Sequence, residues 1–107
     1  MFETKYIPQE NANKMVAILN KCLEINPDLK FHVITDDEGD MIYKGNNPEK
    51  AVNEMDGYDC NFGVNCMDNE KFIGWFFFTP YEDIEDVVCD HTDNDFCNRF
   101  VKNRRIK

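Results

Sequence analysis

A strict alternation of apolar and polar residues in the middle of the chain constrains the fold more than any other feature. Five apolar side chains recur at every second position, with Asp, Asn or Gly between them: Tyr58, Cys60, Phe62, Val64 and Cys66. A period of two is that of a β-strand with one buried and one hydrated face. Residues 58–66 are therefore expected to form a strand in a sheet that exposes one face.

The next apolar segment, residues 72–79, carries large apolar side chains on both faces of an extended chain. A turn-like sequence, residues 67–71, separates it from the alternating segment, and Pro80 ends it. A strand that is apolar on both faces is typical of a sheet centre or of an interface. The two segments together predict an antiparallel pair.

Three further elements are predicted before this pair. Apolar residues at helical spacing predict an amphipathic helix from about Gln9 to Leu23. Residues 30–44 have strand composition on either side of an acidic turn, which is the pattern of a β-hairpin. Asn47 as N-cap and Pro48 at the first helical position predict a short helix that Gly57 ends.

The last third of the chain is less regular. Val87–Cys89 is a candidate short strand, and Thr92 followed by Asp95 fits the start of a terminal helix with apolar residues over 96–101. The predicted order is αββαββ(β)α. This order indicates an α+β fold in one domain, residues 1–107, with a small antiparallel sheet of about four strands and helices packed on one face.

Charge is distributed unevenly along the sequence. The 107 residues include 12 Lys and Arg against 21 Asp and Glu, for a formal net charge of −9 at pH 7. Residues 36–98 hold 17 acids and three bases, whereas residues 99–107 carry five bases and no acid. The basic C-terminal end suits the dipole of a last helical turn. A chain this negative repels phosphates, so direct binding to nucleic acid is not expected.

Missing patterns argue against several classes of protein. The five cysteines, without an apolar leader at the N-terminus, indicate reduced thiols in a cytosolic protein. Their spacings lack the short pairs of a zinc site, and the acidic stretches that begin at Asp36 and Asp90 lack the Gly and Glu of a calcium loop. The longest apolar run, Trp75–Phe78, is far too short to cross a membrane. No metal, cofactor or membrane segment is predicted.

Catalytic patterns are missing as well. A nucleophilic Cys66 or Cys89 would need His32 or His91 as its base, and paired carboxylates would need a pocket that shifts their pKa values. No glycine-rich phosphate loop is present. The sequence therefore predicts a protein that is not an enzyme, and a cryptic small enzyme or metal-binding protein is the third-ranked alternative.

Acidic clusters are the strongest functional signal. A fold that presents carboxylates as a duplex presents phosphates, about one charge per 1.7 Å of axis, can occupy a basic groove, although net charge also serves solubility alone. One cluster lies around the predicted short helix: Glu49, Glu54, Asp56 and Asp59. The predicted partner-binding residues, in the hairpin turn and in the segment 82–95, are Asp36, Asp37, Glu38, Asp40, Glu82, Asp83, Glu85, Asp86, Asp90, Asp93 and Asp95.

In size, acidity, α+β content and lack of catalytic motifs, the chain resembles phage-encoded inhibitors of bacterial defence, including anti-CRISPR and anti-restriction DNA mimics. Gly74-Trp75-Phe76 followed by Asp90-His91-Thr92-Asp93-Asn94-Asp95 is similar to a pattern in small phage proteins. The resemblance implies a location in the cytoplasm of a bacterial host. It also implies a macromolecular target, a basic surface on a nucleic-acid-processing complex whose substrate the protein would block.

An assembly module is the second hypothesis. The doubly apolar strand 72–79 would pair across a two-fold axis or dock on a partner by hydrophobic contact. The predicted contact residues are Ile73, Trp75, Phe77 and Tyr81. Monomer and homodimer are both open.

Overall fold

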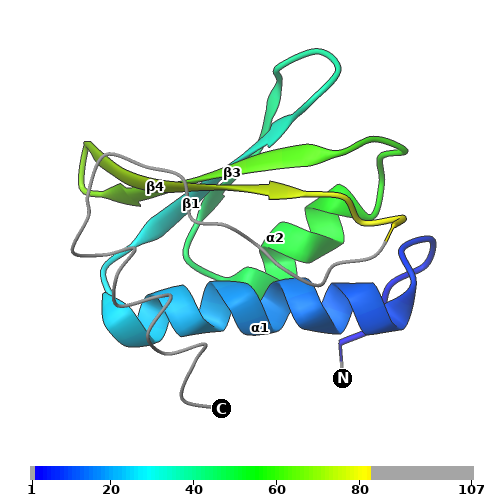
Figure 1. Ribbon diagram of the computed structural model, residues 1–107, viewed down its shortest axis with the longest axis horizontal. Helices are drawn as coiled ribbons and strands as arrows, with labels where there is room; N and C mark the ends of the chain where they lie inside the picture. The colour runs from blue at the N-terminus through cyan, green and yellow to red at the C-terminus, as the bar shows by residue number, and fades with distance from the viewer. Residues whose placement is uncertain (1, 83–107) are drawn as a thin grey trace.

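Two helices and four strands make up the part of the protein that the computed structural model describes, residues 2–82 (Figure 1). Their order is α1 (Gln9–Ile25), β1 (Lys30–Thr35), β2 (Met41–Gly45), α2 (Pro48–Met55), β3 (Phe62–Asp68) and β4 (Lys71–Phe78). The strand expected at Val87–Cys89 and the terminal helix expected over 96–101 lie outside the described residues.

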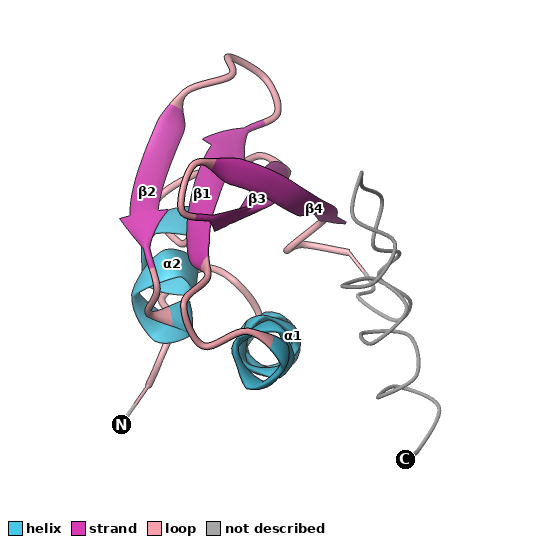
Figure 2. Ribbon diagram, turned by 90° about the vertical axis from the view of Figure 1, so that its left-hand side faces the viewer, coloured by secondary structure: helices cyan, strands magenta, loops and turns pink. Residues whose placement is uncertain are grey.

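The four strands form one antiparallel sheet in the order β2-β1-β3-β4. The chain thus contains two consecutive units, α1-β1-β2 and α2-β3-β4, and the sheet joins them through the central β1–β3 ladder. Figure 2 shows both helices on the same side of the sheet. The predicted α+β class, with a small antiparallel sheet and helices on one face, is confirmed.

The core lies between the helices and the face of the sheet that they cover, which we call the inner face. Alternate residues of the strands point into it, and the rings of Phe76 and Phe78 stack there with centroids 6.3 Å apart. The largest fully buried side chains include Phe31, Phe62, Phe76, Phe78, Met15, Leu19, Leu29 and Met55. Burial of these side chains is the dominant stabilising term.

The start of α2 follows the predicted chemistry. Asn47 is the N-cap, and its side-chain oxygen accepts a hydrogen bond from the backbone N–H of Lys50 at 3.2 Å. Pro48 occupies the first helical position, where a missing N–H costs nothing. The hydroxyl oxygen of Tyr43 in β2 accepts from the N–H of Asn47 at 3.1 Å, which ties the helix start to the sheet.

The strand predicted to begin at Tyr58 begins four residues later, at Phe62. The Tyr58 N–H donates to the carbonyl of Met55 at 3.0 Å, which makes this segment the turn that follows α2. The neighbouring strand β1 ends at Thr35, the partner of Phe62, so the β1–β3 ladder stops there. Residues 58–61 therefore form a bent loop, although their residue types alternate as those of a strand do.

Candidate partner-binding surface

The β1–β2 hairpin presents four exposed carboxylates at its tip, those of Asp36, Asp37, Glu38 and Asp40. Below the tip, the buried Thr35 donates its N–H to the carbonyl of Asp40 at 2.9 Å and accepts the Asp40 N–H on its hydroxyl at 3.0 Å. Gly39 has φ 72°, in the left-handed region that glycine adopts without cost, and donates its N–H to the Thr35 carbonyl. These bonds close the turn and fix where the carboxylates project.

Hydrogen bonds bring two other acidic segments to the same end of the sheet. The N–H of Asp36 donates to the carbonyl of Asn61 at 2.9 Å and so joins the tip to the loop that carries Asp59. The Tyr81 hydroxyl donates to the carbonyl of Tyr58 at 2.9 Å and joins that loop to the segment after β4. Three stretches that are distant in sequence therefore meet.

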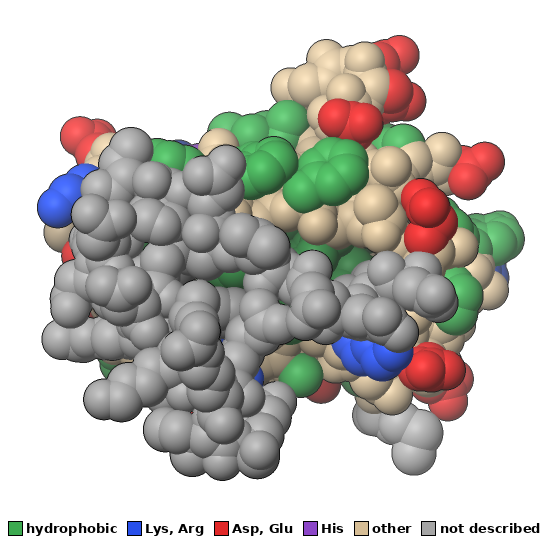
Figure 3. Space-filling model, in the orientation of Figure 1, with side chains coloured by type: hydrophobic (Ala, Val, Ile, Leu, Met, Phe, Trp, Pro, Cys, Tyr) green, Lys and Arg blue, Asp and Glu red, His purple; other side chains and the backbone are tan. Residues whose placement is uncertain are grey.

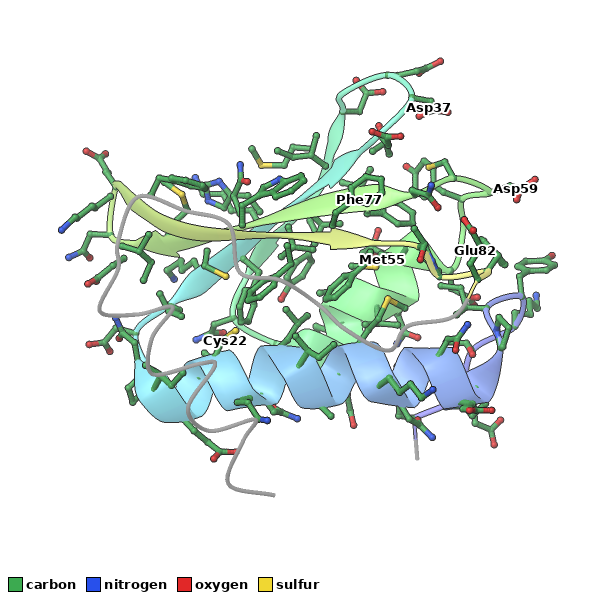
Figure 4. The ribbon with its side chains drawn as sticks, in the orientation of Figure 1. Cys22, Asp37, Met55, Asp59, Phe77 and Glu82 are labelled. Atoms are coloured by element: carbon green, nitrogen blue, oxygen red, sulfur yellow. The ribbon has the colours of Figure 1, made fainter. Side chains whose placement is uncertain are left out.

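The segment after β4 is also held by α1. The side-chain amide of Asn11 donates to the carbonyl oxygens of Pro80 and Glu82 at 2.8 and 2.7 Å. Figure 4 shows Asp37, Asp59 and Glu82 at the right-hand end of the molecule. We call this region the acidic end, and its members are Asp36, Asp37, Glu38, Asp40, Asp59 and Glu82.

Two side chains within the acidic end respond to its negative charge. Burial and the carboxylate of Asp37 raise the pKa of the Cys60 thiol. A hydrogen bond from the backbone of Asp36 opposes this rise, and the charges of Asp36 and Asp59 add to it. Burial also raises the pKa of the Tyr81 hydroxyl, and the charges of the neighbouring Asp56 and, less strongly, of Asp59 raise it further. Because carboxylates from separate segments act on one thiol, their fields overlap at this end of the molecule.

The opposite end of the sheet carries both signs of charge. Lys30 begins β1 there, and Lys71 pairs with Asp68 across the β3–β4 turn that also contains Glu70. In Figure 3 acidic side chains lie around the hairpin tip at the top and down the right-hand side, where a basic side chain lies beside acids at the lower right, and a basic and an acidic side chain lie together at the left. Carboxylates are therefore densest around the hairpin tip and are mixed with lysine elsewhere.

One acid of the cluster predicted around the short helix, Asp56, stabilises the fold. The carboxylate of Asp56 accepts hydrogen bonds from the backbone N–H groups of Lys5, Tyr6 and Ile7 at 2.6, 2.9 and 2.8 Å. Burial alone would raise the pKa of this carboxyl, but the three N–H donors and the Lys5 charge hold the pKa below its ordinary value. Asp56 thus fastens the N-terminal segment to the end of α2 and is not part of the acidic end.

The predicted oligomer contacts divide between the core and the surface. Ile73 is 3% exposed and belongs to the core, so its predicted place in an exposed contact is wrong. The β3–β4 register shifts at this point and leaves Ile73 without an opposite residue, which breaks the alternation of faces. Trp75 is half-buried and Phe77 is 39% exposed, both on the face away from the helices, the outer face; Tyr81 is 38% exposed.

Six of the predicted partner-binding residues lie outside the described residues: Asp83, Glu85, Asp86, Asp90, Asp93 and Asp95. Sequence reasoning also missed Tyr58, which is 43% exposed within the acidic end. Its alternation with Phe62 suggested a buried ring, but the loop turns it so that it packs edge-on against Phe62 with centroids 6.2 Å apart. The available signal was Gly57, which marks the preceding turn.

The thiol and imidazole considered for catalysis do not meet in residues 2–82. Cys66 is buried on the inner face, where it hydrogen-bonds the thiol of Cys22, and burial raises the pKa of Cys22 well above its ordinary value. His32 lies on the outer face, opposite Asn65.

Residues 2–82 contain no group of three or more His, Cys, Asp or Glu that could hold a metal ion. They also contain no helix long and apolar enough to span a membrane.

Comparison with known proteins returned no matching family model, no matching curated protein and no matching solved structure.

Proposed function

We propose that the chain is a non-enzymatic interaction protein whose acidic end occupies a basic, nucleic-acid-binding groove on another protein. The observation that carries the proposal is the convergence of carboxylates from the hairpin tip, the loop before β3 and the segment after β4. Hydrogen bonds to the backbone hold together the segments that carry these charges, so the backbone under them is arranged before a partner arrives. A pre-arranged backbone lowers the entropic cost of binding.

Carboxylates suit the same partners that phosphates suit. Asp and Glu accept paired hydrogen bonds from Arg, and a concentrated negative field speeds encounter with a basic surface. Such a protein would compete with nucleic acid for the groove. The likeness to phage inhibitors of bacterial defence suggests a nucleic-acid-processing defence complex as the target.

The test uses two variants with equal changes of charge. The acidic-end variant is Asp36→Lys, Glu38→Lys, Asp40→Lys and Asp59→Lys. Asp37 is kept because its carboxylate accepts the Glu38 N–H at 2.8 Å and shapes the turn. The control variant reverses four acids at the opposite end: Glu24→Lys, Asp28→Lys, Asp68→Lys and Glu70→Lys.

Each tagged protein is incubated with a bacterial lysate, and the captured proteins are challenged with excess duplex DNA. The wild type and the control variant should both capture the partner, and duplex DNA should release it. The partner should also be released at about 1 M salt, where the Debye length is only about 3 Å. The acidic-end variant should bind about a hundredfold more weakly, since each rim charge contributes roughly 0.7 kcal/mol. Equal loss in both variants, or captured proteins that DNA does not displace, would contradict the proposal.

A further inference from the structure

We propose that Trp75 and Phe77 form an aromatic platform on the outer face that receives arginine side chains of the basic partner. This inference rests on the proposed function and deepens it, because it names the side chain that the surface selects. The two rings stack with centroids 5.9 Å apart and an interplanar angle of 27°. Both rings lie on a face that no helix of residues 2–82 covers, and Phe77 is 39% exposed there (Figure 2).

Gly63 determines how the platform lies. Trp75 pairs with Asn65 and Phe77 pairs with Gly63, so both rings project from the outer face of β4 next to β3. A Cβ atom at residue 63 would lie 2.9 Å from Trp75 Nε1, closer than side-chain contacts normally allow. The indole therefore extends across β3 over a position that has no side chain, and a side chain at residue 63 would displace it.

The platform borders the acidic end. Phe77 is opposite Gly63, Gly63 is opposite Ile34, and Ile34 precedes the hairpin tip by two residues. Two strand spacings of about 4.8 Å and two residues of about 3.3 Å rise separate Phe77 from Asp36, so the backbones of the platform and of the tip lie roughly 12 Å apart on one side of the molecule. In Figure 3 exposed hydrophobic side chains lie directly below the acidic tip.

Charge and ring chemistry together select arginine. A guanidinium stacks on an aromatic face and donates paired hydrogen bonds to a carboxylate at its edge, whereas a lysine ammonium is a strongly hydrated point charge. The adjacent carboxylates repel phosphate, which argues against a nucleic acid on this face. A second copy is also disfavoured, because two chains of charge −9 repel each other.

The chain's single tryptophan makes the test direct. Arginine and lysine homopeptides of equal length are titrated into the full chain, with binding followed by Trp75 emission and by anisotropy of the labelled peptide. The wild type should bind the arginine peptide about fivefold more tightly than the lysine peptide, with a change in Trp75 emission.

Trp75→Leu and Phe77→Leu should remove that preference and leave the binding of lysine peptide unchanged. Tyr6→Leu is the matched control, since Tyr6 is 68% exposed on the N-terminal segment, away from the platform, and the preference should persist. Thermal unfolding of each variant verifies that it folds.

Three results would overturn the inference. Equal affinity of the wild type for the two peptides would refute the arginine-selective platform but would still be consistent with binding at the acidic end. Absence of binding to either peptide would remove the proposed function with it. A change in Trp75 emission on raising the concentration of the protein alone would assign the face to a second copy.

Discussion

The two faces of the sheet carry aromatic side chains of the same kind with different surroundings. On the inner face, Phe76 and Phe78 are fully buried under the helices. On the outer face, Trp75 and Phe77 are partly exposed, although they are neighbours of those residues in sequence. Aromatic side chains therefore stabilise the core on the inner face, whereas on the outer face they remain partly accessible to solvent.

The largest effect should separate neighbouring phenylalanines. Phe78→Ala should lower the free energy of unfolding by about 4 kcal/mol, because it leaves a cavity in the core. Phe77→Ala should lower it by about 1 kcal/mol or less, since that ring is partly solvated already. Urea unfolding of both variants measures the difference. Equal losses would mean that the outer face is covered in solution.

A smaller effect is expected at Asp56, the carboxylate that holds the N-terminal segment against the end of α2. Asp56→Asn should cost about 2 kcal/mol, because charge-assisted hydrogen bonds to the segment carrying the buried Ile7 are weakened. Asp59→Asn changes the same charge without such contacts and should cost almost nothing.

The pH dependence has a definite sign. The Asp56 pKa is lowered in the folded state, so its contribution is fully present above the ordinary value of 3.8 and is lost as pH falls through the lowered pKa. Acid unfolding of the two variants and the wild type measures it. If Asp56→Asn and Asp59→Asn show the same acid transition, the stabilising role of the Asp56 carboxylate is refuted.

The smallest effect belongs to the outer face. Burial and the charge of Lys44 lower the pKa of His32 below its ordinary 6.5. The unfolded chain therefore binds a proton first, and stability should decline slightly as pH falls from 6.5 to the folded pKa. Lys44→Met should raise the His32 pKa measured by NMR titration, but only in part, because burial is the larger cause. An unchanged His32 pKa in Lys44→Met would mean that the charge of Lys44 does not act on His32.

The sequence was sufficient for the element order because periodicity is a local property. The 3.6-residue stripe of α1, the Asn47-Pro48 start of α2 and the composition of β1 and β2 each predicted an element that is present. The bounds were less accurate: α1 continues to Ile25, two residues past the prediction, and β4 ends at Phe78.

The surface was less predictable because it depends on long-range contacts. No local pattern shows that the Asp36 N–H reaches Asn61, or that Asp56 turns toward Lys5, Tyr6 and Ile7. Ile73 alternates correctly for the outer face, and only the register shift between β3 and β4 places it in the core. The acids of the hairpin were recognisable from sequence, but their neighbours at the acidic end were not.

The central β1–β3 ladder has a consequence for how the protein avoids misassembly. Each helix and its following hairpin can form from nearby residues, so this ladder is the one long-range pairing in the described sheet. A register shift of a single residue there would expose Phe31 and Val33 to solvent and turn His32 toward the hydrophobic core. Correct matching of the two halves during folding thus decides which aromatics solvent can reach.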